Sequence, residues 1–280
     1  MSQPIFYVNG NFVPASEAAL PIGDLGIVRG YGVFDVLRTY NRLPFRLRDH
    51  VQRLQRSAQA IGITLPWTTE EIEETVRLTH DRNTFTDPNI RIIVTGGSSA
   101  NFMTPENRPS LIVMVTPTPV RDESHYSAGC RATTAAVVRE RPEVKSLNYI
   151  GAVMAVEEAR SAGAIEALYR TEDGSVTEGT RANFFILRGR RLITPKDEIL
   201  DGITRKVVLE LAAGHFEIAE EPIPYATLSS VDEAFITSTT KEVLPIVRID
   251  DMTLGTGQPG PHTQTLANLF RSYTESPVRV

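Results

Sequence analysis

The sequence predicts an α+β protein of two domains with mainly antiparallel strands. The chain has 280 residues, which is long enough for two ordinary domains. Hairpin signals and β-rich runs alternate with amphipathic helical segments. The stiff, extended stretch Thr-Pro-Thr-Pro at residues 116–119 is the best candidate for a linker. We therefore expect an N-terminal α/β domain at residues 1–116, a linker at 117–122 and a larger C-terminal domain at 123–280.

The N-terminal domain is predicted to begin with a β-hairpin. An Asn-Gly-Asn turn at residues 9–11 separates the apolar runs 5–8 and 12–13. An Asn-Gly pair between such runs is a strong signal for a tight hairpin turn. Further strands of this domain are predicted at residues 33–40, 43–45, 90–95 and 111–116.

Two amphipathic helices are predicted in the same domain. Apolar residues recur at steps of three and four over residues 47–61, and Gly62 follows at a position that ends many helices. Thr68 and Glu71 form a capping-box signal for a second helix that runs to about Arg82.

The C-terminal domain mixes strands and helices in a less regular order. One helix is expected at residues 149–162. A second helix is expected to begin with Thr204 as its N-cap and to run to about Ala213. Predicted strands lie at residues 167–170, 182–187, 191–193, 234–237 and 243–249.

The composition is that of a soluble globular protein, with 41% hydrophobic and 22% charged residues. The net charge of −5 argues against nucleic acid or an anionic membrane as the main partner. No apolar run is long enough to span a membrane and the N-terminus has no signal pattern, so we expect a cytoplasmic protein. The lone Cys130 excludes an internal disulfide and a cysteine-based zinc site. The histidines, His50 among them, lack metal-ligand spacing, so no metal is expected.

Three features of the second half of the chain together point to one cofactor. Lys145, in a segment rich in apolar and hydroxyl residues, is a candidate Schiff-base nucleophile. Glu178 is a candidate partner for a protonated ring nitrogen. Residues 202–204 and 237–240 offer backbone N–H and hydroxyl donors that suit a phosphate. An aldehyde, a pyridine nitrogen and a phosphate together describe pyridoxal 5'-phosphate (PLP).

Each candidate residue also has an ordinary structural interpretation. Lys145 can form an exposed ion pair with Glu143, which is what most lysines do. Glu178 can be a turn carboxylate, and Thr204 can be only a helix cap. Arg53 can be one of several exposed arginines of its helix, although its place beside the apolar stripe lets it point inward.

Six short motifs are spread over nearly the whole chain. They are Arg29-Gly-Tyr-Gly-Val-Phe-Asp35, Asp49-His-Val-Gln-Arg-Leu54, Lys145-Ser-Leu-Asn148, Thr177-Glu-Gly-Thr-Arg-Ala-Asn-Phe-Phe185, Asp201-Gly-Ile-Thr-Arg205 and Thr237-Ser-Thr-Thr-Lys-Glu242. In this order the set resembles the class IV, fold-type IV, PLP-dependent aminotransferases. That family includes D-amino acid aminotransferases, branched-chain aminotransferases and aminodeoxychorismate lyase.

The resemblance implies a smaller N-terminal α/β domain, a larger C-terminal domain with a β-barrel-like core, and a homodimer. It implies that Lys145 is catalytic, binding PLP as a Schiff base and moving the transferred proton. It implies that Glu178 keeps the pyridine nitrogen protonated, so that the ring can withdraw electrons. The other cofactor-binding residues that it implies are Arg53, Ile203, Thr204 and Thr239 at the phosphate, Tyr149 at the ring oxygen and Leu200 at the ring face.

The hand of an amino acid substrate depends on where its carboxylate binds. Because Lys145 works on one face of the substrate, exchanging the carboxylate and the side chain reverses the chirality that is accepted. The best-known D-amino acid enzymes of the family carry a tyrosine in the segment that matches Val33-Phe34-Asp35, and an Arg-x-His pair after the strand that matches residues 90–95. This chain has Phe34 in the first segment and neither arginine nor histidine at residues 96–103. The branched-chain pattern also fits imperfectly, because residues 238–241 are Ser, Thr, Thr and Lys.

Three arginines are candidates for a different carboxylate clamp, since a guanidinium can bind a carboxylate bidentately. Arg29 precedes a glycine-rich loop, Arg181 follows the predicted glutamate turn, and Arg91 lies on a predicted strand. Arg29 and Arg181 can equally form structural ion pairs with Asp24 or Asp35. The remaining substrate-binding candidates are Phe34 and, through its backbone N–H, Thr240.

The function that these implications favour is transamination from a D-amino acid, of the D-alanine or D-glutamate type, to a 2-oxo acid such as 2-oxoglutarate. The reaction would be ping-pong through pyridoxamine phosphate. A branched-chain L-amino acid aminotransferase is the first alternative, favoured if Tyr31, Val33 and Phe34 form a closed apolar pocket. An aminodeoxychorismate-type lyase is the next. A vitamin B6-binding protein without catalysis is disfavoured, because binding alone does not need a proton-shuttling Lys145.

Overall fold

The computed structural model describes residues 3–276, which form two compact units. The first unit contains residues 3–119 and the segment Val144–Asn148. The second unit contains Val120–Glu143 and Tyr149–Ser276. Residues 1–2 and 277–280 of the two predicted domains lie outside the described residues.

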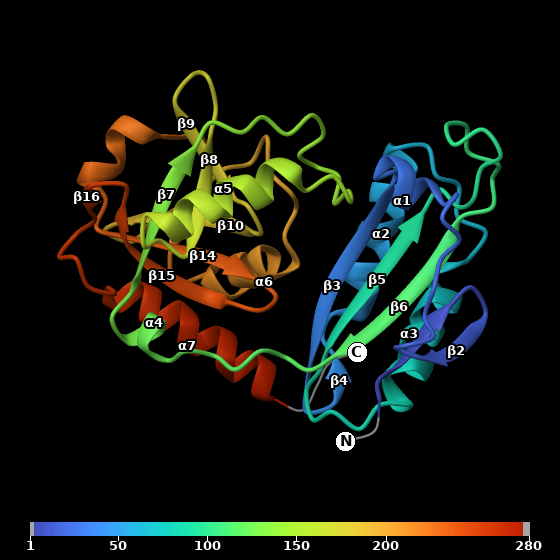
Figure 1. Ribbon diagram of the computed structural model, residues 1–280. Helices are drawn as coiled ribbons and strands as arrows, with labels where there is room; N and C mark the ends of the chain where they lie inside the picture. The colour runs from blue at the N-terminus through green and yellow to red at the C-terminus, as the bar shows by residue number, and fades with distance from the viewer. Residues whose placement is uncertain (1–2, 277–280) are drawn as a thin grey trace. The chain divides into compact units, whose positions relative to one another are not determined.

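The first unit is an antiparallel sheet covered by helices α2 and α3 (Figure 1). The strand order is β2-β1-β6-β5-β3-β4, and the predicted hairpin is confirmed as β1–β2. The predicted strands β3 and β4 form a second hairpin. The elements are β1 (Ile5–Val8), β2 (Asn11–Pro14), α1 (Leu25–Arg29), β3 (Gly32–Tyr40), β4 (Leu43–Pro44), α2 (Leu47–Ala60), α3 (Thr69–Asp81), β5 (Asn89–Thr95) and β6 (Ser110–Thr116).

Helix α2 packs its apolar stripe into the core of this unit, which confirms the predicted periodicity. Leu47, Val51, Leu54 and Ala58 pack on strand β3 and are buried in one cluster with apolar residues of β5 and β6. Full burial of one such leucine or valine side chain stabilises the fold by about 1.5–3 kcal/mol. Arg53 is only 5% exposed, so its interpretation as an exposed helix arginine is wrong. Burial of the adjacent apolar stripe turns this guanidinium inward.

Helix α3 begins with the predicted capping box. The backbone N–H of Glu71 donates to the Thr68 hydroxyl at 3.2 Å, and the Thr68 N–H donates to the Glu71 carboxylate at 2.8 Å. Two of the N–H groups that a helix start leaves without a partner are thereby satisfied.

The second unit contains a closed ring of strands, so the expected β-barrel-like core is confirmed (Figure 1). The ring runs β10-β14-β15-β7-β8-β9 and returns from β9 to β10. Strand β7 is parallel to β15 and to β8, and the other pairs in the ring are antiparallel. The strands are β7 (Cys130–Ala135), β8 (Glu166–Arg170), β9 (Ser175–Gly179), β10 (Ala182–Arg188), β14 (Glu233–Ser238) and β15 (Glu242–Ile249).

Shorter strands extend this sheet, and helices cover the ring. The strands are β11 (Arg191–Thr194), β12 (Glu217–Glu220), β13 (Ile223–Pro224) and β16 (Met252–Thr253). The helices are α4 (Ser124–Ser127), α5 (Ile150–Ser161), α6 (Ile203–Ala212), the 3-10 helix Tyr225–Ser230 and α7 (Pro261–Glu275). Helix α5 packs on β7 and β8, and α7 packs on β14 and β15. None of the helices within residues 3–276 has the length and apolar character needed to cross a bilayer.

The expected N-cap of helix α6 was wrong. The helix begins at Ile203, and its N-cap is Gly202, with extended backbone angles of φ −68° and ψ 132°. Thr204 therefore lies inside the first turn, because an N-cap residue must keep non-helical angles. A Cβ atom on Gly202 would lie 1.9 Å from the Asn183 side-chain oxygen. Glycine at this position allows the close approach of Asn183.

The segment Val144–Asn148 pairs with the first half of strand β3. The Phe34 N–H donates to the Lys145 carbonyl at 2.9 Å, and the Leu147 N–H donates to the Gly32 carbonyl at 2.9 Å. A Cβ atom on Gly32 would lie 2.6 Å from the Val94 carbonyl oxygen and 2.7 Å from a methyl carbon of Leu147. Only glycine therefore allows the segment to approach the sheet this closely.

We predict that Gly32→Ala lowers the free energy of unfolding by about 1–3 kcal/mol, because the new methyl group overpacks this junction. Chemical denaturation measures the change. Gly151→Ala in helix α5 is the matched control, since its nearest neighbour would be a flexible Val137 methyl group at 3.1 Å. Equal stability of the Gly32 variant and the wild type would contradict the packing argument.

Candidate active site

The backbone of Lys145 is held in place by the first unit. Besides the pairing with Phe34, the Lys145 N–H donates to the hydroxyl of Ser57 on helix α2 at 3.2 Å. Val144, the preceding residue, is fully buried in the core of the same unit. The lysine is thus fixed at its base by a strand edge and a helix, although it belongs to an irregular part of the chain.

The Lys145 side chain lies beside an aromatic ring. Its Nζ atom is 4.8 Å from the centroid of the Phe34 ring, and the guanidinium carbon of Arg91 is 5.3 Å from the same centroid. Phe34 is 7% exposed, and Lys145 is half-buried. The expected competing partner, Glu143, forms an ion pair with Arg141 at 3.2 Å.

Arg53 belongs to a buried cluster with Asp35 and His50. Its Nε and Nη2 atoms each donate to Asp35 at 2.8 Å, and His50 Nδ1 is 2.7 Å from the same carboxylate. Asp35 is fully buried and His50 is 1% exposed. Burial opposes ionisation of Asp35, but the charges and hydrogen bonds of Arg53 and His50 outweigh burial and hold the pKa of Asp35 well below its ordinary value.

The sequence interpretation found Arg53 but missed its two partners. Asp35 was considered only as an ion-pair partner for Arg29 or Arg181, and His50 only as a possible metal ligand. A signal existed: His50 and Arg53 are three residues apart on one helix, so their side chains lie on the same face. Burial lowers the pKa of His50, an effect that the Asp35 carboxylate partly offsets.

Glu178 lies at the end of strand β9 in the second unit and is 4% exposed. One carboxylate oxygen is paired with the Arg139 guanidinium. The other accepts the backbone N–H of Leu200 at 3.0 Å and the side-chain amide of Asn183 at 3.4 Å. The interpretation of Glu178 as an ordinary turn carboxylate is wrong, because a buried carboxylate with charged and polar partners is held in one position.

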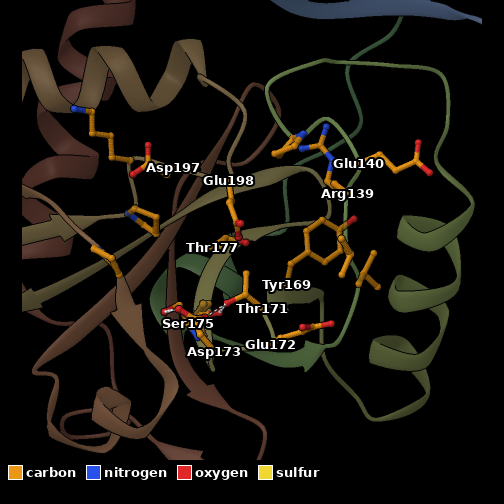
Figure 2. Close-up of a pocket in the computed structure, with 17 residues that line it drawn as sticks. Arg139, Glu140, Tyr169, Thr171, Glu172, Asp173, Ser175, Thr177, Asp197 and Glu198 are labelled. Carbon is orange, nitrogen blue, oxygen red and sulfur yellow. Dashed lines mark hydrogen bonds between the residues drawn. The ribbon is translucent and has the colours of Figure 1, made fainter.

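Arg139 is a site residue that the sequence interpretation missed. It lies 39 residues before Glu178, in an irregular stretch that no periodic pattern marks. Arg139 lines a pocket of about 730 Å³. Figure 2 shows it in the wall of this pocket together with Tyr169 and Thr177. The residues that line this pocket all belong to the second unit. Burial and the neighbouring Glu178 raise the pKa of Tyr169, while Arg139 opposes the rise.

Apart from Arg53, the predicted phosphate-binding residues occupy two turns of the second unit. Ile203 and Thr204 form the first turn of helix α6, where Gly202 provides no side-chain cap for the free N–H groups. Thr239 and Thr240 lie at the tip of the β14–β15 hairpin, with Thr239 half-buried and Thr240 exposed. Uncapped N–H groups at a helix start and nearby hydroxyls are donors that suit an anion.

Tyr149 is the N-cap residue of helix α5 and is half-buried. Its carbonyl accepts the Val153 N–H at 2.9 Å, so its position is set by the start of the helix.

Two of the candidate clamp arginines are not paired with the acidic residues considered for them. Asp24 accepts hydrogen bonds from Gly26, Thr95 and Ser110, and Asp35 is paired with Arg53. The guanidinium of Arg29 donates to the carbonyl of Val28 at 2.9 Å, and both Arg29 and Arg181 are exposed. Within residues 3–276, no salt bridge involves either of them. The structural ion pairs expected for Arg29 and Arg181 are therefore absent from this part of the chain.

The residues of both units have the chemistry that PLP requires. The first unit supplies an amine on a fixed backbone, Lys145, and a buried guanidinium, Arg53. The second unit supplies a buried carboxylate, Glu178, and uncapped donors at a helix start and a hairpin tip. Over the described residues, no group of three or more His, Cys, Asp and Glu side chains is arranged to hold a metal ion.

Comparison with known proteins identifies the family. The family model for amino-transferase class IV matches residues 32–249, so the chain belongs to the class IV aminotransferases and its cofactor is PLP. A Methanocaldococcus jannaschii protein named "Putative branched-chain-amino-acid aminotransferase" is 37% identical over 276 residues, covering 95% of this chain and 94% of that protein. The D-alanine aminotransferase of Staphylococcus aureus is 34% identical over 277 residues, covering 96% and 98%.

Solved structures of the same family have the same fold. A branched-chain amino acid aminotransferase from T.th., solved with pyridoxamine 5'-phosphate, superposes with a TM-score of 0.92 at 28% identity, covering 99% of this chain and 96% of that one. The branched-chain aminotransferase from Thermoproteus uzoniensis with norvaline gives a TM-score of 0.89 at 32% identity, covering 98% and 95%. The expected fold-type IV architecture is confirmed.

We predict that lowering the pH reduces the free energy of unfolding of the protein because His50 becomes protonated on unfolding. A histidine whose pKa is lowered on folding binds fewer protons in the folded than in the unfolded state, so stability is present above the ordinary histidine pKa and is lost as pH falls below it. One such proton contributes at most about 1.4 kcal/mol per pH unit. Unfolding of the wild type at pH 7.5 and pH 5.5 measures the loss.

His50→Gln is the control variant, because it removes the titrating ring and keeps a side-chain amide that can donate to Asp35. The stability gap between the wild type and this variant is expected to narrow as the pH falls. A gap that stays constant over this pH range would show that His50 does not titrate differently in the two states.

Proposed function

We propose that the protein is a D-amino acid aminotransferase that uses a 2-oxo acid such as 2-oxoglutarate as acceptor. The observation that carries this proposal is the placement of Arg91 and Lys145 on one aromatic ring, that of Phe34. A guanidinium is a suitable carboxylate ligand, and Lys145 is the reacting amine. The similarity to D-alanine aminotransferases at 34–35% identity over nearly the whole chain supports the same activity.

When bound, PLP withdraws electrons from the α-carbon of the amino acid. We assign the residues of this chain to that chemistry as follows. Lys145 is the catalytic residue, and its Nζ atom takes up and returns the α-proton. Glu178 holds a proton on the ring nitrogen, and Leu200, whose N–H is bound to Glu178, faces the ring. The remaining cofactor ligands are Arg53, Ile203, Thr204 and Thr239 for the phosphate and Tyr149 for the ring oxygen.

The substrate carboxylate is proposed to bind on the side of strands β3 and β5. Arg91 projects from β5 over Phe34 of β3, and the two strands pair with Phe34 opposite Ile93. Arg29 and Arg181 carry exposed guanidiniums. The acidic residues considered as their partners, Asp24 and Asp35, are bound to other residues, so each guanidinium can bind a substrate carboxylate. Thr240, in the second unit, is proposed to offer its backbone N–H to the substrate. A carboxylate on the arginine side rather than the Thr240 side selects the D-enantiomer.

A branched-chain L-amino acid aminotransferase is the second candidate. The Methanocaldococcus jannaschii relative and the similar solved structures carry that name. Phe34, which is 7% exposed, offers apolar surface that suits a branched side chain, whereas Val33 is fully buried in the core of the first unit. The Tyr31 hydroxyl already donates a hydrogen bond to the Ile61 carbonyl at 2.6 Å, so this side chain has a structural role.

A half-reaction scan separates these candidates. The holoenzyme is mixed separately with D-alanine, D-glutamate, L-leucine and L-glutamate, and conversion of PLP to pyridoxamine phosphate is followed by visible absorbance. We expect rapid conversion by the D-amino acids alone. Rapid conversion by L-leucine and L-glutamate alone would establish the branched-chain activity instead. Conversion by none of the four would favour the aminodeoxychorismate-type lyase. Lys145→Ala is expected to convert with none of them.

We predict that Arg91→Gln raises the KM for the D-amino acid by about 10- to 100-fold, because a charge-assisted hydrogen bond contributes about 1.5–3 kcal/mol. Steady-state kinetics with D-alanine and D-glutamate measure the change. Arg77→Gln removes an exposed arginine of helix α3 and serves as the charge-matched control. The clamp is wrong if both variants keep the wild-type KM.

We also propose a cytoplasmic homodimer. Helix α5 exposes large apolar side chains, with Ile150, Val153 and Met154 each at least 59% exposed, and burial of such a face drives association. Light scattering coupled to size-exclusion chromatography tests the dimer.

A further inference from the structure

Glu166 is a buried carboxylate that the proposed chemistry does not use. It is fully buried on strand β8, and its partners are all in the second unit. Lys241 Nζ lies 2.5 Å from one carboxylate oxygen. The other oxygen accepts the hydroxyl of Thr180 and, at 3.2 Å each, the backbone N–H groups of Thr180 and Ala167. Burial of a charge is costly unless the charge is paired and hydrogen-bonded. The donors around Glu166 satisfy its carboxylate and hold it firmly in place.

Lys241 connects this carboxylate to the hairpin tip that carries Thr239 and Thr240. Its backbone N–H donates to the Ser238 hydroxyl at 3.2 Å, and its carbonyl accepts the Tyr126 hydroxyl at 2.8 Å. Its side chain is 19% exposed and runs inward to Glu166. A long, flexible lysine that is bound at both its backbone and its ammonium group restrains the turn in which it lies.

Thr180 connects the same carboxylate to the strand end that carries Glu178. Only Gly179 separates the two residues, and it is buried against Glu166: a Cβ atom there would lie 3.0 Å from the Glu166 side chain. Thr180 continues the backbone into the turn before strand β10. The position of Glu166 is therefore coupled to the position of the Glu178 backbone.

We propose that Lys241, Glu166 and Thr180 form a positioning network for PLP. The network joins the hairpin tip at Thr239 and Thr240 to the strand end at Glu178. It thereby holds a phosphate ligand and the ring-nitrogen ligand at a constant separation. This inference rests on the residue assignments under Proposed function. None of the three side chains needs to touch PLP, so they act through Thr239 and Glu178.

Because PLP is rigid, the distance between Thr239 and Glu178 limits the affinity for PLP. If the hairpin tip moves relative to strand β9, PLP can satisfy its phosphate or its ring nitrogen, but not both at full strength. Loss of the Lys241 ammonium also leaves the Glu166 charge buried without its cationic partner. Both effects weaken PLP binding more than they weaken a substrate contact.

The test measures PLP affinity rather than turnover. Holoenzyme of each full-length variant is dialysed against a series of PLP concentrations, and bound PLP is measured from its visible absorbance. Lys241→Met is expected to raise the Kd for PLP by about 10- to 100-fold, by analogy with the loss of metal affinity when residues that orient metal ligands are removed. Lys241→Arg keeps the charge and is expected to retain most of the affinity. The double variant Glu166→Gln with Lys241→Met is expected to bind better than Lys241→Met alone, because no uncompensated charge remains.

Ile246→Val is the control for general destabilisation, because it removes one methylene group from the barrel core and lies outside the network. It is expected to keep the wild-type Kd. The network is refuted if Lys241→Met also keeps the wild-type Kd, or if Ile246→Val raises the Kd as much as Lys241→Met does.

Thr239→Ala and Glu178→Gln separate a failure of the network from a failure of the proposed cofactor ligands. If these two variants bind PLP more weakly while Lys241→Met does not, only the network is wrong. If both variants keep the wild-type Kd, the assignment of the cofactor ligands is wrong, and the network falls with it.

Discussion

The position of Lys145, the proposed catalytic residue, depends on a backbone pairing between the segment Val144–Asn148 and the edge of strand β3. The carbonyl of Lys145 and the N–H of Leu147 bond to Phe34 and Gly32, and the Lys145 N–H bonds to Ser57. A lysine side chain has several rotatable bonds, so only a fixed backbone restricts where its amine can reach. The ring of Phe34 then restricts the positions of the Lys145 amine on one side. The absence of a side chain at Gly32 is what allows the pairing.

Buried carboxylates with basic partners organise both units. Asp35 binds Arg53 and His50, Glu178 binds Arg139, and Glu166 binds Lys241. Each carboxylate is 4% exposed or less, so removing one partner would leave a charge without compensation in a region of low dielectric constant. Such pairs contribute position more than stability. In this enzyme they hold residues that are proposed to bind the phosphate and the ring nitrogen of PLP.

Much of the fold could be predicted from local patterns. The Asn-Gly turn predicted the first hairpin, the stripe of helix α2 predicted its buried face, and Thr68 with Glu71 predicted the start of α3. The start of α6 was predicted wrongly. Its N-cap is Gly202, where the close approach of Asn183 leaves no room for a side chain. Asn183 is 19 residues away in the sequence, so a rule based on neighbouring residues cannot predict this contact. The partners Arg139 and Lys241 were missed for the same reason.

The sequence by itself determined the family and which residue types can do its chemistry, because motif order and side-chain identity are properties of the chain alone. It therefore indicated Lys145, Glu178 and Arg53 before any coordinates. Only the tertiary structure decided what each of these residues is bound to. Asp35 is paired with Arg53 rather than with Arg29, and Glu178 is paired with Arg139. Ion pairing depends on distance in space and on burial, and both are set when strands far apart in the sequence close into a sheet.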